Sequence, residues 1–289
     1  MVASLAGADR IGPAAVRFLD RTTPPHIATL ILCAGLPALS MSIFLPSLAH
    51  MAEHFGTSYA VMQLAVSGYL ATTAVLQVAV GSVADSLGRR PVMIGAFALF
   101  VLATLGTLLA PSAGVFLAFR MMQGAVVTGI VLSRAVVRDT VGPEESASKI
   151  GYVTMGMSLI PMVGPMIGGA LDEVWGWRAS FVFLAVAGIG VLALVLADQG
   201  ETARRKGGGF VEQMGHYPAL LGSRRFWAYT LCATFASGAF YALLGGAAFV
   251  AGRVYGLSPL WTGIALGSPA IGYALGNFLS GRFSVRVGI

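Results

Sequence analysis

The chain is 289 residues long; 56% of its residues are hydrophobic, only 10% are charged, and its mean hydropathy is +0.81. A soluble domain carries charge on roughly a quarter of its residues, so this composition excludes an ordinary soluble protein and predicts an integral membrane protein with the lipid bilayer as its solvent. The formal net charge of +6 is spread over several polar segments without a basic tract, so we expect no nucleic-acid partner.

Eight apolar runs are long enough, at about 20 residues each, to cross a bilayer as α-helices. The first run is too long for a cleaved signal peptide and follows a polar start, so it is expected to remain as a span. The sequence predicts an all-α fold with a tail at 1–25, a six-helix bundle at 26–198, a linker at 199–224 and two further helices at 225–289. The predicted spans are 26–48, 60–84, 91–110, 114–138, 149–171, 177–198, 225–250 and 260–282.

Arginine and lysine residues gather on one side of these spans, and only Arg178 and Arg253 fall on the other side. Cytoplasmic loops retain positive charge. We therefore predict a multi-pass protein of the plasma membrane with both termini of this chain in the cytoplasm.

The second part of the chain repeats features of the first part at an offset of 200 positions. The coincident pairs are Gly56 and Gly256, Ser58 and Ser258, Gly81 and Gly281, and Gly88 and Gly288. Parallel repeats of six spans are a known transporter plan. On this plan the second half stops after two spans, so we expect a C-terminally truncated product that transports poorly unless it oligomerises.

The segment Gly81-Ser82-Val83-Ala84-Asp85-Ser86-Leu87-Gly88-Arg89-Arg90 predicts a polar turn between the second and third spans. Gly81 and Gly88 permit a tight reversal, and Asp85 can accept hydrogen bonds near the positive N-terminus of the third helix. Arg89 and Arg90 hold the loop in the cytoplasm. The alternative is a loop that only sets the topology.

Arg120-Met121-Met122-Gln123-Gly124 places a cation inside the fourth predicted span. Exposing this charge to lipid would cost about 3 kcal/mol. Arg120 is therefore expected to face a wet cavity or a polar partner. The alternative is that its side chain reaches back to the outer membrane surface.

The fifth predicted span contains Gly164-Pro165-Met166-Ile167-Gly168-Gly169. Pro165 leaves a backbone carbonyl without its helical donor, and the three glycines allow a neighbouring helix to come close. The alternative is a generic kinked packing helix.

These segments resemble the major facilitator superfamily, and within it the Bcr/CflA type of drug efflux pumps. The turn matches G-x-x-x-D-x-x-G-R-[RK], the fourth span matches R-x-x-Q-G, and the fifth resembles the G-P-x-x-G-G core of the antiporter motif. Leu45-Pro46-Ser47-Leu48 and Ser133-Arg134-Ala135-Val136-Val137-Arg138-Asp139 resemble narrower Bcr/CflA segments.

The resemblance implies the major facilitator fold and proton-coupled drug export by alternating access. It packs the fifth span on the eighth and assigns coupling or gating to residues of all three motifs. These residues are Gly81, Asp85, Gly88, Arg89, Arg90, Arg120, Gln123, Gly124, Gly164, Pro165, Gly168 and Gly169. Ser42 stands where the family usually has an aspartate, and no acidic residue is convincingly placed at mid-membrane. An importer or facilitator of a small metabolite, or an inert truncated membrane protein, therefore remains open.

Polar residues inside the spans are the candidates for a substrate pathway, because they tend to face the bundle interior. His50 and His54 could share a metal, but without a third ligand we expect no metal site. No catalytic constellation or cofactor motif lies within the spans, so an enzyme is not expected. The pathway candidates are Ser40, Ser42, Tyr69, Tyr241 and Asn277.

Overall fold

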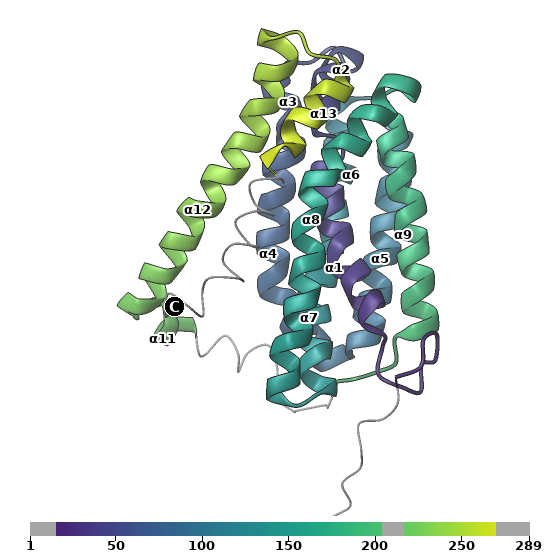
Figure 1. Cartoon of the computed structure of the whole chain (residues 1–289), viewed down its shortest axis with the longest axis vertical. Helices are drawn as coiled ribbons and strands as arrows, with labels where there is room; N and C mark the ends of the chain where they lie inside the picture. The colour runs from purple at the N-terminus through teal and green to yellow at the C-terminus, as the bar shows by residue number, and fades with distance from the viewer. Residues whose placement is uncertain (1–15, 204–216, 270–289) are drawn as a thin grey trace, which may run out of the picture.

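The computed structural model describes residues 16–203 and 217–269, and helices are the regular secondary structure throughout this part of the chain (Figure 1). The eighth predicted span begins as α13 (Pro259–Gly267), and its remainder lies outside the described residues. The all-α membrane fold is thus confirmed. Within the described residues, seven segments are long and apolar enough to cross a membrane: Ile27–His54, Tyr59–Leu87, Arg89–Leu108, Ala113–Thr140, Ser148–Trp175, Arg178–Asp198 and Arg224–Val254.

Short 3-10 segments interrupt the first and fourth spans, and a π-helical turn ends the seventh. The elements of the first six spans are α1 (Ile27–Ser42), η1 (Leu45–Ser47), α2 (Leu48–His54), α3 (Tyr59–Met62), α4 (Leu64–Leu87), α5 (Arg89–Leu108), α6 (Ala113–Met122), η2 (Gln123–Val127), α7 (Thr128–Thr140), α8 (Pro143–Trp175) and α9 (Arg178–Asp198). They are followed by α11 (Tyr217–Leu221), α12 (Arg224–Phe249), η3 (Val250–Val254) and α13.

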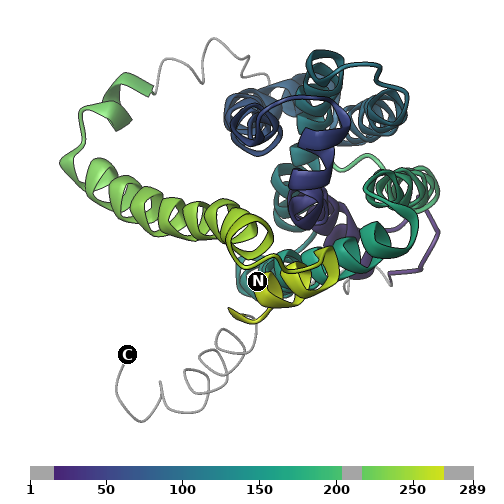
Figure 2. The same cartoon turned by 90° about the horizontal axis from the view of Figure 1, so that it is seen from above.

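The first six spans form a bundle around α1, which contacts α7, α8 and α9 (Figures 1 and 2). α12 meets the bundle near α2, α3 and α13 and leans away from it toward the other end (Figure 1). We call these two ends of the molecule the α2 end and the Gly88 end, the latter after the turn between α4 and α5. The backbone of α12 therefore lies farther from the bundle at the Gly88 end than at the α2 end (Figure 1).

Aromatic side chains close the bundle at the α2 end. The ring centroid of Phe116 lies 5.4 Å from that of Phe181 and 5.5 Å from that of Phe55. Trp177 packs on all three of these rings, and Phe44 joins the cluster through Phe181. Each such pair adds about 1 kcal/mol to the burial of its rings. The cluster holds the ends of α1, α2, α6 and α9 together.

The glycines of the fifth span bring α8 against the end of α1, as the sequence predicts. A Cβ atom at Gly164 would collide with the Ser42 hydroxyl, and one at Gly168 would overlap the carbonyl of Ile43. Both glycines are buried. Backbone contact at this crossing therefore depends on the absence of a side chain at both positions.

The same span packs on α13 through glycines on both helices. A Cβ atom at Gly169 would overlap the carbonyl of Pro259, and one at Gly263 would overlap the carbonyl of Pro165. The expected packing of the fifth span on the eighth is confirmed for the described part of the eighth. This crossing joins the first bundle to the second half.

The predicted turn at 81–90 is shorter than expected. α4 continues to Leu87, so Gly81 and Asp85 lie within the helix and Gly81 takes no part in the reversal. Gly88 alone makes the turn, with a φ of +103° that favours glycine. The helix continues because the residues between Gly81 and Gly88 are compatible with helical geometry.

Part of the predicted repeat is reproduced in the backbone. Gly56 and Gly256 both have positive φ, at 60° and 63°. Two residues later, Ser58 and Ser258 stand at the N-caps of α3 and α13. The other two pairs, with Gly281 and Gly288, lie partly outside the described residues.

Substitution of Gly168 by alanine tests the α1–α8 crossing. We expect Gly168→Ala to reduce the free energy of unfolding by about 1–3 kcal/mol, because the added methyl group forces the helices apart. The matched control is Gly151→Ala, also in α8, where a Cβ atom would meet nothing within 4 Å. The control should be neutral or stabilising by about 0.5–1 kcal/mol. Thermal unfolding in detergent measures both, and equal stability of the two variants would contradict the packing argument.

Candidate functional site

Arg120, on α6, is fully buried in the first bundle and is held by several acceptors. Its Nη1 donates to Ser40 Oγ at 2.9 Å and to Gln123 Oε1 at 2.6 Å. Nη2 donates to the Ser40 carbonyl at 2.8 Å, and Nε to the Ala65 carbonyl at 3.1 Å. The guanidinium thus has polar partners, as the sequence predicts, and the alternative that it reaches the outer surface is wrong.

The end of α1 explains how this cation is accommodated without a carboxylate. α1 ends at Ser42, so the Ser40 carbonyl is among the last four of the helix, which lack intrahelical donors. The helix C-terminus also carries partial negative charge. Among the ion pairs of the described residues, none involves Arg120. Arg120 therefore neutralises the interrupted end of α1.

Two aromatic rings cover the Arg120 guanidinium. The Arg120 Cζ atom lies 4.0 Å from the ring centroid of Tyr69 and 4.6 Å from that of Phe44. Such cation–π contacts contribute about 2 kcal/mol where water is excluded. The Tyr69 hydroxyl donates to the Pro37 carbonyl at 3.3 Å. The Tyr69 side chain is thus held both by the Arg120 guanidinium and by the Pro37 carbonyl.

Gln123 and Gly124 continue the network into η2. Gln123 is buried, and its Nε2 donates to Thr104 Oγ1 at 2.7 Å on α5. A Cβ atom at Gly124 would lie 3.0 Å from a methyl group of Thr72 on α4. The R-x-x-Q-G segment thus ties α1, α4, α5 and α6 together.

A cavity of about 770 Å³ lies between the first bundle and α12. It falls within the size range of small-molecule sites, about 300–1,000 Å³. No charged side chain lines it among the described residues. The lining residues are Pro37, Ala38, Met41, Tyr69, Leu70, Thr73, Gln77, Val127, Ile130, Met157, Pro161, Ala236, Ser237, Tyr241 and Pro269.

The predicted pathway residues separate into three groups. Tyr69 and Tyr241 line the cavity from opposite sides, on α4 and α12. Ser40 and Ser42 are buried outside the lining; Ser40 binds Arg120, and Ser42 donates to the Ala38 carbonyl at 3.0 Å. Asn277 lies outside the described residues.

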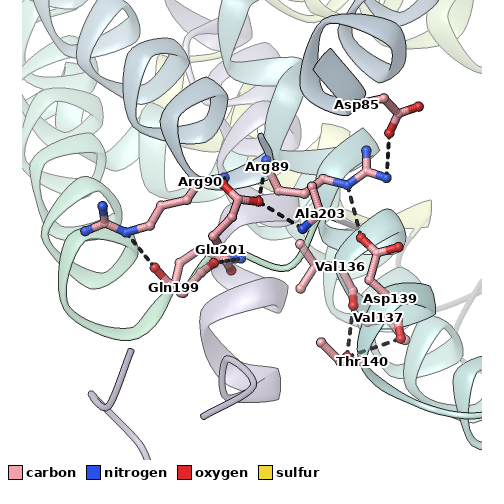
Figure 3. A network of polar contacts seen from close by, with 11 residues as sticks. Asp85, Arg89, Arg90, Val136, Val137, Asp139, Thr140, Gln199, Glu201 and Ala203 are labelled. Carbon is pink, nitrogen blue, oxygen red and sulfur yellow. Dashed lines mark hydrogen bonds and ion pairs between the residues drawn. The ribbon is translucent and has the colours of Figure 1, made fainter. Parts of the chain in front are cut away.

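A polar network surrounds the turn at the Gly88 end (Figure 3). Arg89 Nη2 lies 2.8 Å from Asp85 Oδ1, and Arg89 Nε lies 3.1 Å from Asp139 Oδ2 on α7. Arg90 Nε donates to the Gln199 carbonyl at 2.8 Å, just after α9. The turn therefore binds α4, α5, α7 and the start of the linker to one another.

Glu201 accepts hydrogen bonds from the first backbone amides of α5. The sequence predicts this role for Asp85. The Arg89 amide donates to Glu201 Oε1 at 2.9 Å, and the Arg90 amide to Glu201 Oε2 at 3.3 Å (Figure 3). Asp85 lies in α4 and pairs with the Arg89 side chain instead. A Cβ atom at Gly88 would collide with the Glu201 carboxylate, so glycine is required for this contact as well.

Sequence reasoning did not find several partners of these residues. Thr104, Phe44 and Glu201 carry no motif, and Asp139 was noted only as part of a resembling segment. Asp139 and Glu201 both contact Arg89, from which they are separated by 50 and 112 residues in the sequence. No local pattern in the sequence signals contacts over such separations.

His50 and His54 do not share a ligand. His50 Nδ1 lies 3.0 Å from Asp172 Oδ2, and His54 Nε2 lies 3.1 Å from Arg178 Nη2. Within the part of the chain that the structure describes, no three His, Cys, Asp or Glu residues are placed to hold a metal ion.

Residues 30–289 match the sequence profile described as "Major Facilitator Superfamily", and the chain belongs to this family. It is 33% identical over 219 residues to a chloramphenicol resistance protein of Pseudomonas aeruginosa, covering 74% of this chain and 52% of the relative. It is 30% identical over 269 residues to multidrug resistance protein D of Escherichia coli, covering 89% and 65%. These relatives agree with the Bcr/CflA type. The chain spans about half to two thirds of their length.

Solved structures show the same fold. A bacterial homologue of the human lysosomal transporter Spinster, in an inward-facing and unoccupied conformation, matches with a TM-score of 0.71 and 22% identity, over 90% of this chain and 63% of that one. The human organic anion transporter MFSD10 matches with a TM-score of 0.62 and 19% identity, over 83% and 68%. The chain is therefore an integral multi-pass membrane protein of the major facilitator fold.

Removal of the buried guanidinium tests the network around Arg120. We expect Arg120→Ala to lower the free energy of unfolding by about 3 kcal/mol, because Gln123, the Ser40 hydroxyl and the end of α1 lose their donors in a buried site. The matched control is Arg224→Ala at the exposed start of α12, with an expected change within about 0.5 kcal/mol. Thermal unfolding in detergent compares the two. Similar losses in both variants would show that the network does not hold the bundle.

Proposed function

We propose that the protein is a secondary transporter that exports drugs or other small amphipathic compounds by alternating access, with protons as the coupling ion. Membership of the family and the drug-resistance relatives support transport. The observation that carries the proposal is the cavity of about 770 Å³ between the first bundle and α12, the position between two halves that alternating access requires.

The protein is proposed to lie in the plasma membrane with its Gly88 end facing the cytoplasm. Both chain termini would then lie on the cytoplasmic side. Arg89 and Arg90 lie at this end, together with Arg134 and Arg138 of α7, in agreement with the preference of cytoplasmic loops for positive charge. The cavity would then take up its substrate from the cytoplasmic side, where α12 leans away from the bundle (Figure 1).

The lining of the cavity favours uncharged or weakly polar substrates. Met41 and Met157 supply adaptable apolar surface, while Thr73, Gln77 and Ser237 supply a few hydrogen-bonding groups. A charged substrate would find no opposite charge in the described lining. The relative named for chloramphenicol resistance fits this substrate class.

Arg120 is proposed to act through Tyr69 instead of binding the substrate. Its guanidinium lies behind the Tyr69 ring and outside the cavity lining. A movement of α1 or α6 that changed the Arg120 contacts would move the Tyr69 ring in the cavity wall. This is how the coupling role implied by the R-x-x-Q-G segment would reach the substrate.

Drug accumulation in cells that produce this chain tests the proposed function. Proton-coupled export predicts lower accumulation of chloramphenicol than in control cells, and an uncoupler of the proton gradient should abolish the difference. A difference that survives the uncoupler would exclude the proton gradient as the energy source. No difference in either condition would favour a facilitator of a small metabolite, an alternative supported by the absence of a carboxylate from the described cavity lining, or an inert membrane protein.

Substitution of Tyr241 tests whether the cavity binds the substrate. We expect Tyr241→Ala to raise the half-maximal concentration for export about tenfold, because a buried aromatic contact with a ligand contributes roughly 1.4 kcal/mol. The matched control is Tyr229→Ala, on the same helix but 78% exposed and outside the cavity lining. Concentration-dependent export from vesicles measures both. An unchanged Tyr241→Ala value would remove the cavity from the substrate path.

A further inference from the structure

A second polar cluster lies at the α2 end, opposite the Asp85–Arg89–Asp139 network. Asp172, in the last turn of α8, is only 5% exposed, and its Oδ2 lies 3.0 Å from Nδ1 of His50 on α2. Neither carboxylate oxygen has a hydrogen-bond partner among the described residues, so the contact with His50 is a close approach of charged groups without hydrogen-bond geometry. The His50 side chain is 49% exposed. The His50 imidazole therefore lies between the buried Asp172 carboxylate and the solution at this end.

A small pocket of about 140 Å³ lies beside His50, between the first bundle and the second half. Glu53 and Arg253 line it from opposite sides, and Glu53 Oε1 lies 3.0 Å from Arg253 Nη2. The hydroxyls of Tyr59 and Thr262, which also line the pocket, are buried without a hydrogen-bond partner among the described residues. At about 30 Å³ each, several waters fit in this volume. The pocket is thus a polar space that the Glu53–Arg253 contact spans.

The other charged and titratable groups at this end already have partners. His54 contacts Arg178 at 3.1 Å. Glu173 accepts from Ser258 Oγ at 2.9 Å and from the Leu260 amide at 3.1 Å, at the start of α13. These groups are engaged elsewhere. His50 and Asp172 are the pair placed to exchange a proton with solution beside the pocket.

We propose that the His50–Asp172 pair is a proton-binding site at the α2 end and that proton binding weakens the Glu53–Arg253 contact between the two halves. Histidine changes its charge between about pH 5 and 8. His50 and Glu53 are three residues apart on α2 and face the same pocket. A proton on His50 adds a second cation beside the pocket, which competes with Arg253 for Glu53 and repels Arg253.

The proton site deepens the proposed function, because it would sense the proton gradient in proton-coupled export, and its role in transport rests on that function. The family's usual aspartate position is Ser42 in this chain, and Ser42 is buried against Gly164. Asp172 lies on the same helix as Gly164, two turns further toward the α2 end. The site therefore places a protonatable carboxylate on the helix that joins the two halves.

Distance measurements between spin labels test the site without requiring transport. The full chain, with Cys33 and Cys232 replaced by alanine, carries labels at Ala60 and Tyr255, which are exposed on the two sides of the pocket. Electron–electron resonance in nanodiscs compares samples at about pH 8 and pH 5.5. We expect the population with the longer distance to grow about threefold at the lower pH, the size expected when one partly exposed ion pair is lost.

The variants separate the site from its surroundings. His50→Gln and Asp172→Asn should each abolish the pH response, whereas the matched control His54→Gln should retain it. Glu53→Gln should give the longer distance at both pH values. Absence of a pH response in the unsubstituted protein, its survival in His50→Gln, or its equal loss in His54→Gln would overturn the proposal. A retained response in a chain that exports no drug would instead contradict the proposed function and leave the proton site standing.

Discussion

The burial of one cation, Arg120, is the constraint around which the first bundle is arranged. A guanidinium in the interior requires a full set of acceptors, because an unpaired charge there would be prohibitively costly. The protein supplies them with the interrupted end of α1, the Ser40 hydroxyl, the Ala65 carbonyl and Gln123. Three helices must therefore keep their relative positions for the charge to remain satisfied.

The same constraint links the interior of the bundle to the cavity. Tyr69 has one face against the guanidinium and also lines the cavity. The break at the end of α1 that exposes the Ser40 carbonyl is followed by Ile43, against which Gly168 packs. The position of α8 within the first bundle thus depends on the same point of α1 that holds the cation.

The two ends of the molecule are held by different kinds of contact. At the Gly88 end, Arg89, Arg90 and Glu201 connect elements within the first bundle and the start of the linker (Figure 3). At the α2 end, the Glu53–Arg253 pair and the contacts of Glu173 connect the bundle to the second half. In the described part of the chain, these polar contacts between the bundle and the second half therefore lie at the α2 end.

The sequence by itself determined the class of fold and most of the spans, because length and apolarity are local properties that a bilayer selects directly. It also located Arg120 and the glycines of α8, since a charge or a run of glycines within an apolar span is visible without a structure. The orientation predicted from the charged loops stays a prediction. Only the tertiary structure decided the partners: Ser40 with its free carbonyl for Arg120, Glu201 instead of Asp85 at the start of α5, and Asp172 for His50. These contacts join residues that lie 80 to 122 positions apart in the sequence. They depend on where the helices end and on how the helices are rotated about their axes. Hydropathy and spacing carry no information on either property.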